Sequence, residues 1–201
     1  MTKYMHRIVM SLALAGLALP AAAQNADPNV SSQSIDQRKD NQQDRIGNGV
    51  QSGQLTAGET HNLEKKESEL NQEERDMRKL DNGHLTGGDK ATLDQQQNKL
   101  SNQIYKDKHN TAAQNTDPKS EVGKRAENQQ DRIAQGIKSG QLTAGETSRL
   151  EGRDAAINRE VRNDRAANGG KLTGAEKAQV NRQQNRTSRA IYRDKHNGRT
   201  R

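Results

Sequence analysis

The phrase Gly-x-Leu-Thr-x-x-acid occurs four times, and this repetition limits how the chain can fold more than any other feature. The copies begin at Gly53, Gly83, Gly140 and Gly170. A threonine followed three residues later by an acid is the capping box that starts a helix, and a glycine suits the left-handed end of the preceding helix. We therefore interpret each phrase as a helix boundary, with structural capping roles for Gly53, Thr56, Glu59, Gly83, Thr86, Asp89, Gly140, Thr143, Glu146, Gly170, Thr173 and Glu176.

A longer duplication contains these phrases. Residues 41–110 align with residues 128–197 without a gap at an offset of 87, and 38 of the 70 positions are identical. Residues 22–28 also resemble residues 112–118, so the linker was copied with the module. The predicted organisation is a signal peptide (1–23), a flexible leader (24–35), helical module 1 (36–110), a linker (111–121), helical module 2 (122–197) and a basic tail (198–201).

The predicted fold is all-α, with two tandem antiparallel three-helix modules. Capping signals and apolar spacing predict three helices in each module, and the short loops between them make neighbours antiparallel. The expected helices span residues 36–51, 57–80, 87–108, 122–138, 144–167 and 174–195.

Few residues are available for a core. The chain has no Phe and no Trp, and its mean hydropathy is −1.26. Such a composition approaches that of disordered chains, so we expect a thin core and marginal stability. In the first module the apolar faces comprise Ile46, Val50, Leu55, Leu63, Leu70, Met77, Leu80, Leu85, Leu93, Leu100 and Ile104.

The second module is poorer in apolar residues, and we expect it to be looser. Asp164, Ala167 and Thr187 replace Met77, Leu80 and Leu100 of the first module. Gly152 interrupts its middle helix, at a cost of about 1 kcal/mol.

The first residues have the pattern of a Sec-type secretory signal peptide. Basic residues at Lys3 and Arg7 precede an apolar run over residues 8–19, and Ala21-Ala22-Ala23 suits cleavage near Ala23–Gln24. This pattern predicts a periplasmic or secreted protein without a transmembrane helix once the signal is removed. The chain contains no cysteine, which excludes disulfides, zinc–thiolate sites and thiol catalysis.

The charge is mildly basic, with a formal net charge of +7. An excess of this size favours weak contact with envelope polyanions or with another protein. Specific nucleic-acid recognition is not expected, because one tyrosine near the basic stripe offers no stacking platform. This basic stripe lies near the C-terminus and comprises Arg182, Arg186, Arg189, Arg193, Lys195, Arg199 and Arg201.

The acids of the repeated phrase are the candidate metal ligands. A glycine, an aliphatic residue two positions on and an acid four positions further match the second half of an EF-hand loop, which makes Glu59, Asp89, Glu146 and Glu176 candidate calcium ligands. The first half of the loop does not match, since its ligand positions fall on residues such as Asn48, Val50 and Ser52. Capping is the preferred interpretation, and no metal site is predicted.

The remaining chemistry-bearing residues do not form a known catalytic pattern. The pairs Tyr105–His109 and Tyr192–His196 each share a helix face, which indicates a solvated helix end rather than a metal site. No nucleophile elbow, zinc-protease motif or phosphate-binding loop is present. We also expect the thin core to offer no dry pocket that could shift a pKa. The sequence therefore predicts no catalytic residue and no cofactor.

The whole pattern resembles a loose group of uncharacterised exported bacterial helical-repeat proteins. The resemblance rests on the Arg-Ile-x-x-Gly-x-x-x-Gly-x-Leu-Thr-x-x-Glu phrase and on the Ile-Tyr-x-x-Lys-His-Asn close of each module. It implies the architecture but no activity. The leading hypothesis is a non-enzymatic periplasmic or secreted protein that acts through its surfaces in the envelope or under stress. The alternatives are a hydrophilin-like, largely disordered protectant and a degenerate EF-hand-like divalent-cation binder.

Overall fold

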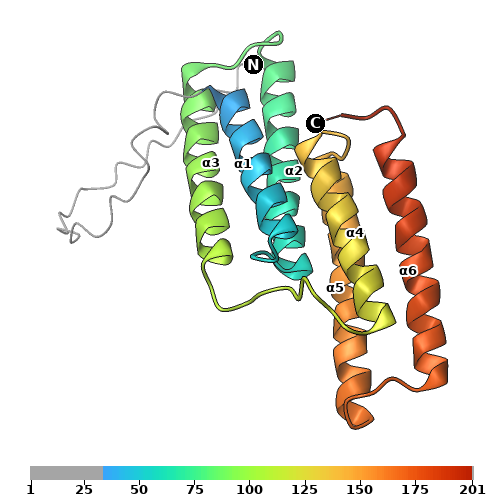
Figure 1. The fold of residues 1–201 in the computed structure, drawn as a ribbon. Coiled ribbons are helices and arrows are strands. Elements are labelled where there is room, and N and C mark those ends of the chain that lie inside the picture. The colour runs from blue at the N-terminus through green and yellow to red at the C-terminus, as the bar shows by residue number, and fades with distance from the viewer. Residues whose placement is uncertain (1–33, 201) are drawn as a thin grey trace, which may run out of the picture. The chain divides into compact units, whose positions relative to one another are not determined.

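The computed structural model describes residues 34–200, and all regular secondary structure in this part of the chain is α-helical (Figure 1). The predicted all-α class is therefore confirmed. The observed helices begin and end within one residue of the predicted bounds. They are α1 (Ile35–Gln51), α2 (Ala57–Leu80), α3 (Gly87–Lys108), α4 (Glu121–Lys138), α5 (Ala144–Ala167) and α6 (Gly174–Lys195). The predicted signal peptide, most of the predicted leader and Arg201 lie outside the described residues.

Side-chain caps fix where the helices start. The four repeated threonines precede α2, α3, α5 and α6, and each accepts a hydrogen bond from the backbone N–H of the acid three residues later. The remaining two helices begin after serines that the repeated phrase does not include: Ser34 caps α1 and Ser120 caps α4. Each cap satisfies a backbone donor that the first helical turn would leave unpaired.

The glycine of each repeated phrase occupies a left-handed turn. Gly53 and Gly140 have φ of 70°, and Gly83 and Gly170 have φ of 91° and 89°. A side chain is strained in this region. These turns reverse the chain, so that consecutive helices run antiparallel within each repeat (Figure 1).

The two repeats pack directly against each other. Residues 33–201 form one compact unit, and α2 has more neighbours on α5 than on any helix of its own repeat. Equivalent positions of the two repeats meet. His61 contacts Ser148, and the Lys138 ammonium donates to the Gln51 side-chain oxygen at 3.0 Å. Contact between positions i and i+87 indicates an approximate two-fold relation between the repeats, as in a symmetric dimer.

The α2–α5 contact is antiparallel and involves the first halves of both helices. A side chain added at Gly152 would approach the His61 ring to 3.1 Å, and one added at Gly145 would approach the Ser68 hydroxyl to 3.1 Å. Gly152 and Gly145 thus both lie on the face of α5 that packs closely against α2. The predicted helix over residues 144–167 includes Gly152, and α5 is continuous through it.

One hydrophobic core joins the two repeats. Its buried members come from all six described helices and from the loops before α2 and α5, namely Ile46, Val50, Leu55, Leu63, Leu100, Ile104, Ile133, Ala134, Ile137, Leu142, Leu150, Ala190 and Ile191. A second cluster, within repeat 2, comprises Val122, Ile157, Val161 and Val180. Burying these side chains in a core shared by both repeats stabilises their association.

Some predicted core positions are not buried. Leu80 is 83% exposed and Met77 is only half-buried. Both lie near the end of α2, beyond its contact with α5. Their replacement by Asp164 and Ala167 in repeat 2 therefore removes little packing, and it gives no reason to expect a looser second module. Among the described helices, none is long and apolar enough to cross a membrane.

Candidate functional site

A groove lies where the two repeats meet. Its volume is about 700 Å³. It is lined by the start of α2, the linker between the repeats, the first turns of α4 and the middle and end of α5. We call it the interrepeat groove. A mixed polar and apolar concavity of this size at the junction of two structural units is typical of ligand-binding sites.

Three arginines of α5 give the interrepeat groove its charge. Arg159, Arg162 and Arg165 follow one another at spacings of three residues, so they share one face of the helix. Lys119 of the linker also lines the groove but is paired with Asp117 at 2.6 Å, and Glu127 of α4 is the one acid among the lining residues. Burial, and after it the charge of Asp131, raises the pKa of Glu127. The groove is therefore strongly basic.

The arginines of the groove are not neutralised by nearby carboxylates. Within the described residues, none of the three forms an ion pair, although Arg165 donates to the Ser120 hydroxyl at 3.2 Å. Arg159 and Arg162 are exposed. A guanidinium without a carboxylate partner keeps its donors available for an anion.

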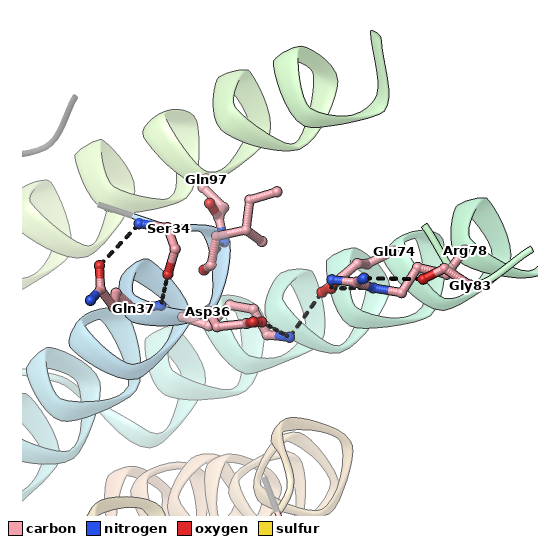
Figure 2. A network of polar contacts seen from close by, with 9 residues as sticks. Ser34, Asp36, Gln37, Glu74, Arg78, Gly83 and Gln97 are labelled. Carbon is pink, nitrogen blue, oxygen red and sulfur yellow. Dashed lines mark hydrogen bonds and ion pairs between the residues drawn. The ribbon is translucent and has the colours of Figure 1, made fainter. Parts of the chain in front are cut away.

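In the equivalent stretch of α2, by contrast, the arginine is paired with a carboxylate (Figure 2). Arg78, the counterpart of Arg165, donates to Glu74 at 2.7 Å, and Lys39 of α1 donates to the same carboxylate at 2.9 Å. Burial raises the pKa of Glu74. The hydrogen bonds and charges of Lys39 and Arg78 together outweigh this effect, so the pKa of Glu74 lies below its usual value. Repeat 2 has Val161 in place of Glu74. Arg165 has therefore lost the partner that this carboxylate supplies to Arg78 in repeat 1.

The linker closes one side of the groove by docking on the first turn region of repeat 1. The backbone N–H of Gln114 donates to the Gly53 carbonyl at 2.8 Å, and the Ala57 N–H donates to the Gln114 side-chain oxygen at 3.3 Å. A side chain at Gly53 would approach Thr116 Cγ2 to 2.7 Å. Gly53 thus permits both the left-handed turn and the close passage of the linker. Apolar atoms of Val122, Ala155 and Val161 line the groove beside the charged groups.

A cluster of buried carboxyl groups lies at the contact between α2 and α5. Glu64 and Glu67 come from α2, and their counterparts Glu151 and Asp154 come from α5. We call these four residues the carboxyl cluster. Burial, and then the charges of Asp154 and Glu64, raises the pKa of Glu151 well above its usual value, and burial raises the pKa of Asp154 to about 7. The expectation that this core could not shift a pKa is therefore wrong.

The four acids considered as calcium ligands lie at separate helix starts. The Glu59 and Glu146 side chains accept from the backbone N–H groups of Thr56 and Thr143 at 2.9 and 3.1 Å. Asp89 and Glu176 make the corresponding bonds at 2.9 and 2.8 Å. Among the described residues, no group of three or more His, Asp or Glu side chains is arranged to hold a metal ion.

The repeated Tyr–His pairs lie at the ends of α3 and α6. The rings of Tyr105 and His109 stack at 4.2 Å, and those of Tyr192 and His196 at 4.3 Å. Each histidine also places Nδ1 within 2.7 Å of the tyrosine carbonyl, and both tyrosines are more than half exposed. These local contacts order the ends of the helices.

The sequence reasoning missed both the interrepeat groove and the carboxyl cluster. The alignment does contain a signal for the groove, because α5 keeps or gains arginines where α2 has Gln72, Arg75 and Arg78, while losing the acids Glu74 and Asp76. The carboxyl cluster gives no such signal, since acids on a polar helix are normally exposed.

Comparison with known proteins gives no relative from which a function can be transferred: no protein family, no curated protein and no solved structure matches this chain. The candidate function therefore rests on the geometry described above.

Proposed function

We propose that this protein is a non-enzymatic helical-repeat protein, periplasmic or secreted, that acts by binding an anionic partner in the interrepeat groove. The observation that carries the proposal is the run of Arg159, Arg162 and Arg165 along a groove of about 700 Å³, without a carboxylate partner among the described residues. The equivalent arginine Arg78 is neutralised in repeat 1. The core shared by both repeats favours such a folded binding protein over a disordered protectant.

The spacing of the arginines suits an extended anion with repeated charges. In a helix, residues three apart are separated by about 4.5 Å along the axis, so the three guanidinium groups can follow a chain of phosphate, sulfate or carboxylate groups. Guanidinium groups bind phosphate and carboxylate with paired donors. The anionic polymers of a bacterial envelope have this chemistry, in agreement with the predicted export.

The proposal is tested by titrating the mature chain into fluorescein-labelled polyphosphate and measuring fluorescence anisotropy at low and moderate ionic strength. The double variant R159Q/R162Q should weaken binding about tenfold, since each exposed charge pair contributes about 0.2–1 kcal/mol. Added salt should weaken binding by the wild type more than binding by the variant.

The chain supplies its own matched control in R75Q. Arg75 is the repeat 1 counterpart of Arg162, and its guanidinium already donates to Gln72 at 2.7 Å. R75Q removes one positive charge outside the groove, so it should change the affinity by less than twofold. If R75Q weakened binding as much as R162Q alone, net charge rather than the groove would be responsible, and the proposal would fail.

The non-enzymatic part of the proposal has a separate test. Purified protein is incubated with panels of ester, peptide, glycan and phosphate substrates, and no turnover is expected. A reaction that disappears after the change of one residue would contradict it.

A further inference from the structure

On the α5 side of the carboxyl cluster, Glu151 and Asp154 share the amide of one glutamine as their donor. The Gln43 amide donates to Glu64 at 3.0 Å, and the Gln130 amide donates to Glu151 at 3.0 Å and to Asp154 at 3.1 Å. Both glutamines are buried and come from α1 and α4, the helices that flank the cluster. These three bonds use both hydrogens of the Gln130 amide, so this amide has no further donor for the carboxyl groups of Glu151 and Asp154.

Three buried oxygens of this group accept no hydrogen bond from the described residues: Oε1 of Glu151 and the side-chain oxygens of Gln43 and Gln130. A buried acceptor without a donor costs about 1–3 kcal/mol. A proton on a carboxyl group converts an acceptor into a donor and also removes a buried negative charge. The composition of the cluster therefore favours protonation of its carboxyl groups.

We propose that the carboxyl cluster is a proton-dependent clamp between the repeats: protons held between α2 and α5 keep the two repeats together, and their release loosens this contact. The clamp goes beyond the proposed binding function, because it concerns the association of the repeats and does not require the interrepeat groove to bind any ligand.

Among the described groups that shift the pKa values of Glu151 and Asp154, Arg153 is the one cation, and its effect is smaller than that of burial. From α5, Arg153 lowers the pKa of Asp154, and from α2, the charge of Glu64 raises the pKa of Glu151. The flanking helices α1 and α4 contribute the neutral amides of Gln43 and Gln130. Lys39 of α1 is paired with Glu74. His61 of α2 places Nδ1 2.7 Å from the Ser148 carbonyl of α5.

The direction of the response follows from the raised pKa values. Unfolded glutamate and aspartate titrate near 4.5 and 3.8, whereas Asp154 titrates near 7 in the folded protein and Glu151 well above its usual value. Between the unfolded and the folded pKa values, the protein binds more protons when the two repeats are in contact than when they are apart. The contact therefore loses stability as pH rises. The contact is tightest below the unfolded pKa values of 4.5 and 3.8 and weakest above the folded pKa values.

The absence of cysteine from the chain makes a direct distance measurement practical. Cysteines introduced at the exposed positions Lys99 of α3 and Arg186 of α6 carry spin labels on the two repeats. Double electron–electron resonance should give a narrow distance distribution at pH 5.5 and a broader or longer one at pH 8.5. The double variant E151Q/D154N should retain the narrow distribution at both pH values, because amides remain neutral.

A matched control removes two acids from the exposed surface of α2. The variant E69Q/D76N makes the same change in charge at side chains that are more than half exposed, and it should respond to pH as the wild type does. Circular dichroism checks that every variant is folded, and E151Q alone replaces the double variant if the latter is not. A wild-type distance that is the same at both pH values, or an E151Q response equal to that of the wild type, would overturn the clamp.

Discussion

The second halves of α2 and α5 occupy equivalent positions in the two repeats but are stabilised by different interactions. In α2 the buried Glu74 bridges Lys39 and Arg78 (Figure 2). In α5 the same position is Val161, which packs with Val122, Ile157 and Val180. Ala126 replaces Lys39, whereas Arg165 preserves Arg78. One repeat therefore uses an ion-pair network where the other uses an apolar cluster.

The ion-pair network and the apolar cluster have different consequences for the charge of the nearby surface. A buried ion pair can be replaced by apolar residues with little loss of stability, so the helices need not change. Removal of the acid, however, leaves Arg165 without the partner that Arg78 has in repeat 1. Arg162 and Arg165 persist in repeat 2, Arg159 is added, and all three line the interrepeat groove. A change that is nearly neutral for the core has thus made one of two equivalent surfaces basic.

The largest change in the free energy of unfolding is expected when Val161 of repeat 2 is replaced by glutamate, the residue at the equivalent position 74 of repeat 1. Val161→Glu places a carboxylate among apolar side chains, where Arg165 alone can compensate it, and should reduce the free energy of unfolding by about 3 kcal/mol. Chemical denaturation followed by circular dichroism measures the loss. Val161→Ala serves as the control for lost apolar burial.

The second change, Ala126→Lys, tests whether the network can be transplanted. It supplies the counterpart of Lys39, so V161E/A126K should recover about 1 kcal/mol or more of the loss, whereas A126K alone should not stabilise the protein. Additive effects of the two substitutions would show that the repeats differ in more than these positions.

A smaller effect is expected from removing one cation of the repeat 1 network. Lys39→Ala leaves the buried Glu74 with Arg78 as its remaining partner and should cost about 1–2 kcal/mol. The double variant K39A/E74V, which copies repeat 2, should be closer to the wild type than K39A is. A K39A protein as stable as the wild type would mean that the network contributes little.

The pH dependence of the network should be opposite to that of the carboxyl cluster. The pKa of Glu74 is lowered in the folded state, so its contribution is present above the unfolded value of 4.5 and is lost as pH falls through the folded value. Glu74→Gln should therefore lower stability at pH 6 by about 1 kcal/mol and by less at pH 3.5. Urea denaturation at the two pH values checks this, with Glu69→Gln as an exposed control.

Much of the secondary structure could be predicted because its signals are local. The repeated threonines and glycines coincide with the observed starts of α2, α3, α5 and α6 and with the left-handed turns before them. Caps and positive φ depend on neighbouring residues alone. Even the serine caps of α1 and α4 are ordinary local signals.

The packing of the repeats could not be predicted in this way. A helical period shows which residues share a face, but not which partner covers that face. From the sequence alone, Glu64 and Glu151 are expected to be solvated, but the packing of α2 against α5 buries both. Likewise Gly152 is expected only to weaken its helix, whereas in the structure it lies opposite His61. The interrepeat groove also depends on this placement, because the start of α2 and the end of α5 are far apart in the sequence.

The smallest effect is expected at a position where the periodic pattern is misleading. Leu80 continues the apolar spacing of α2 but is 83% exposed, and its counterpart is Ala167. Leu80→Ala should therefore change the free energy of unfolding by less than about 0.5 kcal/mol. Leu63→Ala, on the same helix but fully buried, should cost about 2–5 kcal/mol. If L80A instead cost more than 1 kcal/mol in thermal or chemical denaturation, the end of α2 would be packed in solution, and the two repeats would differ there by more than the exchange of Glu74 for Val161.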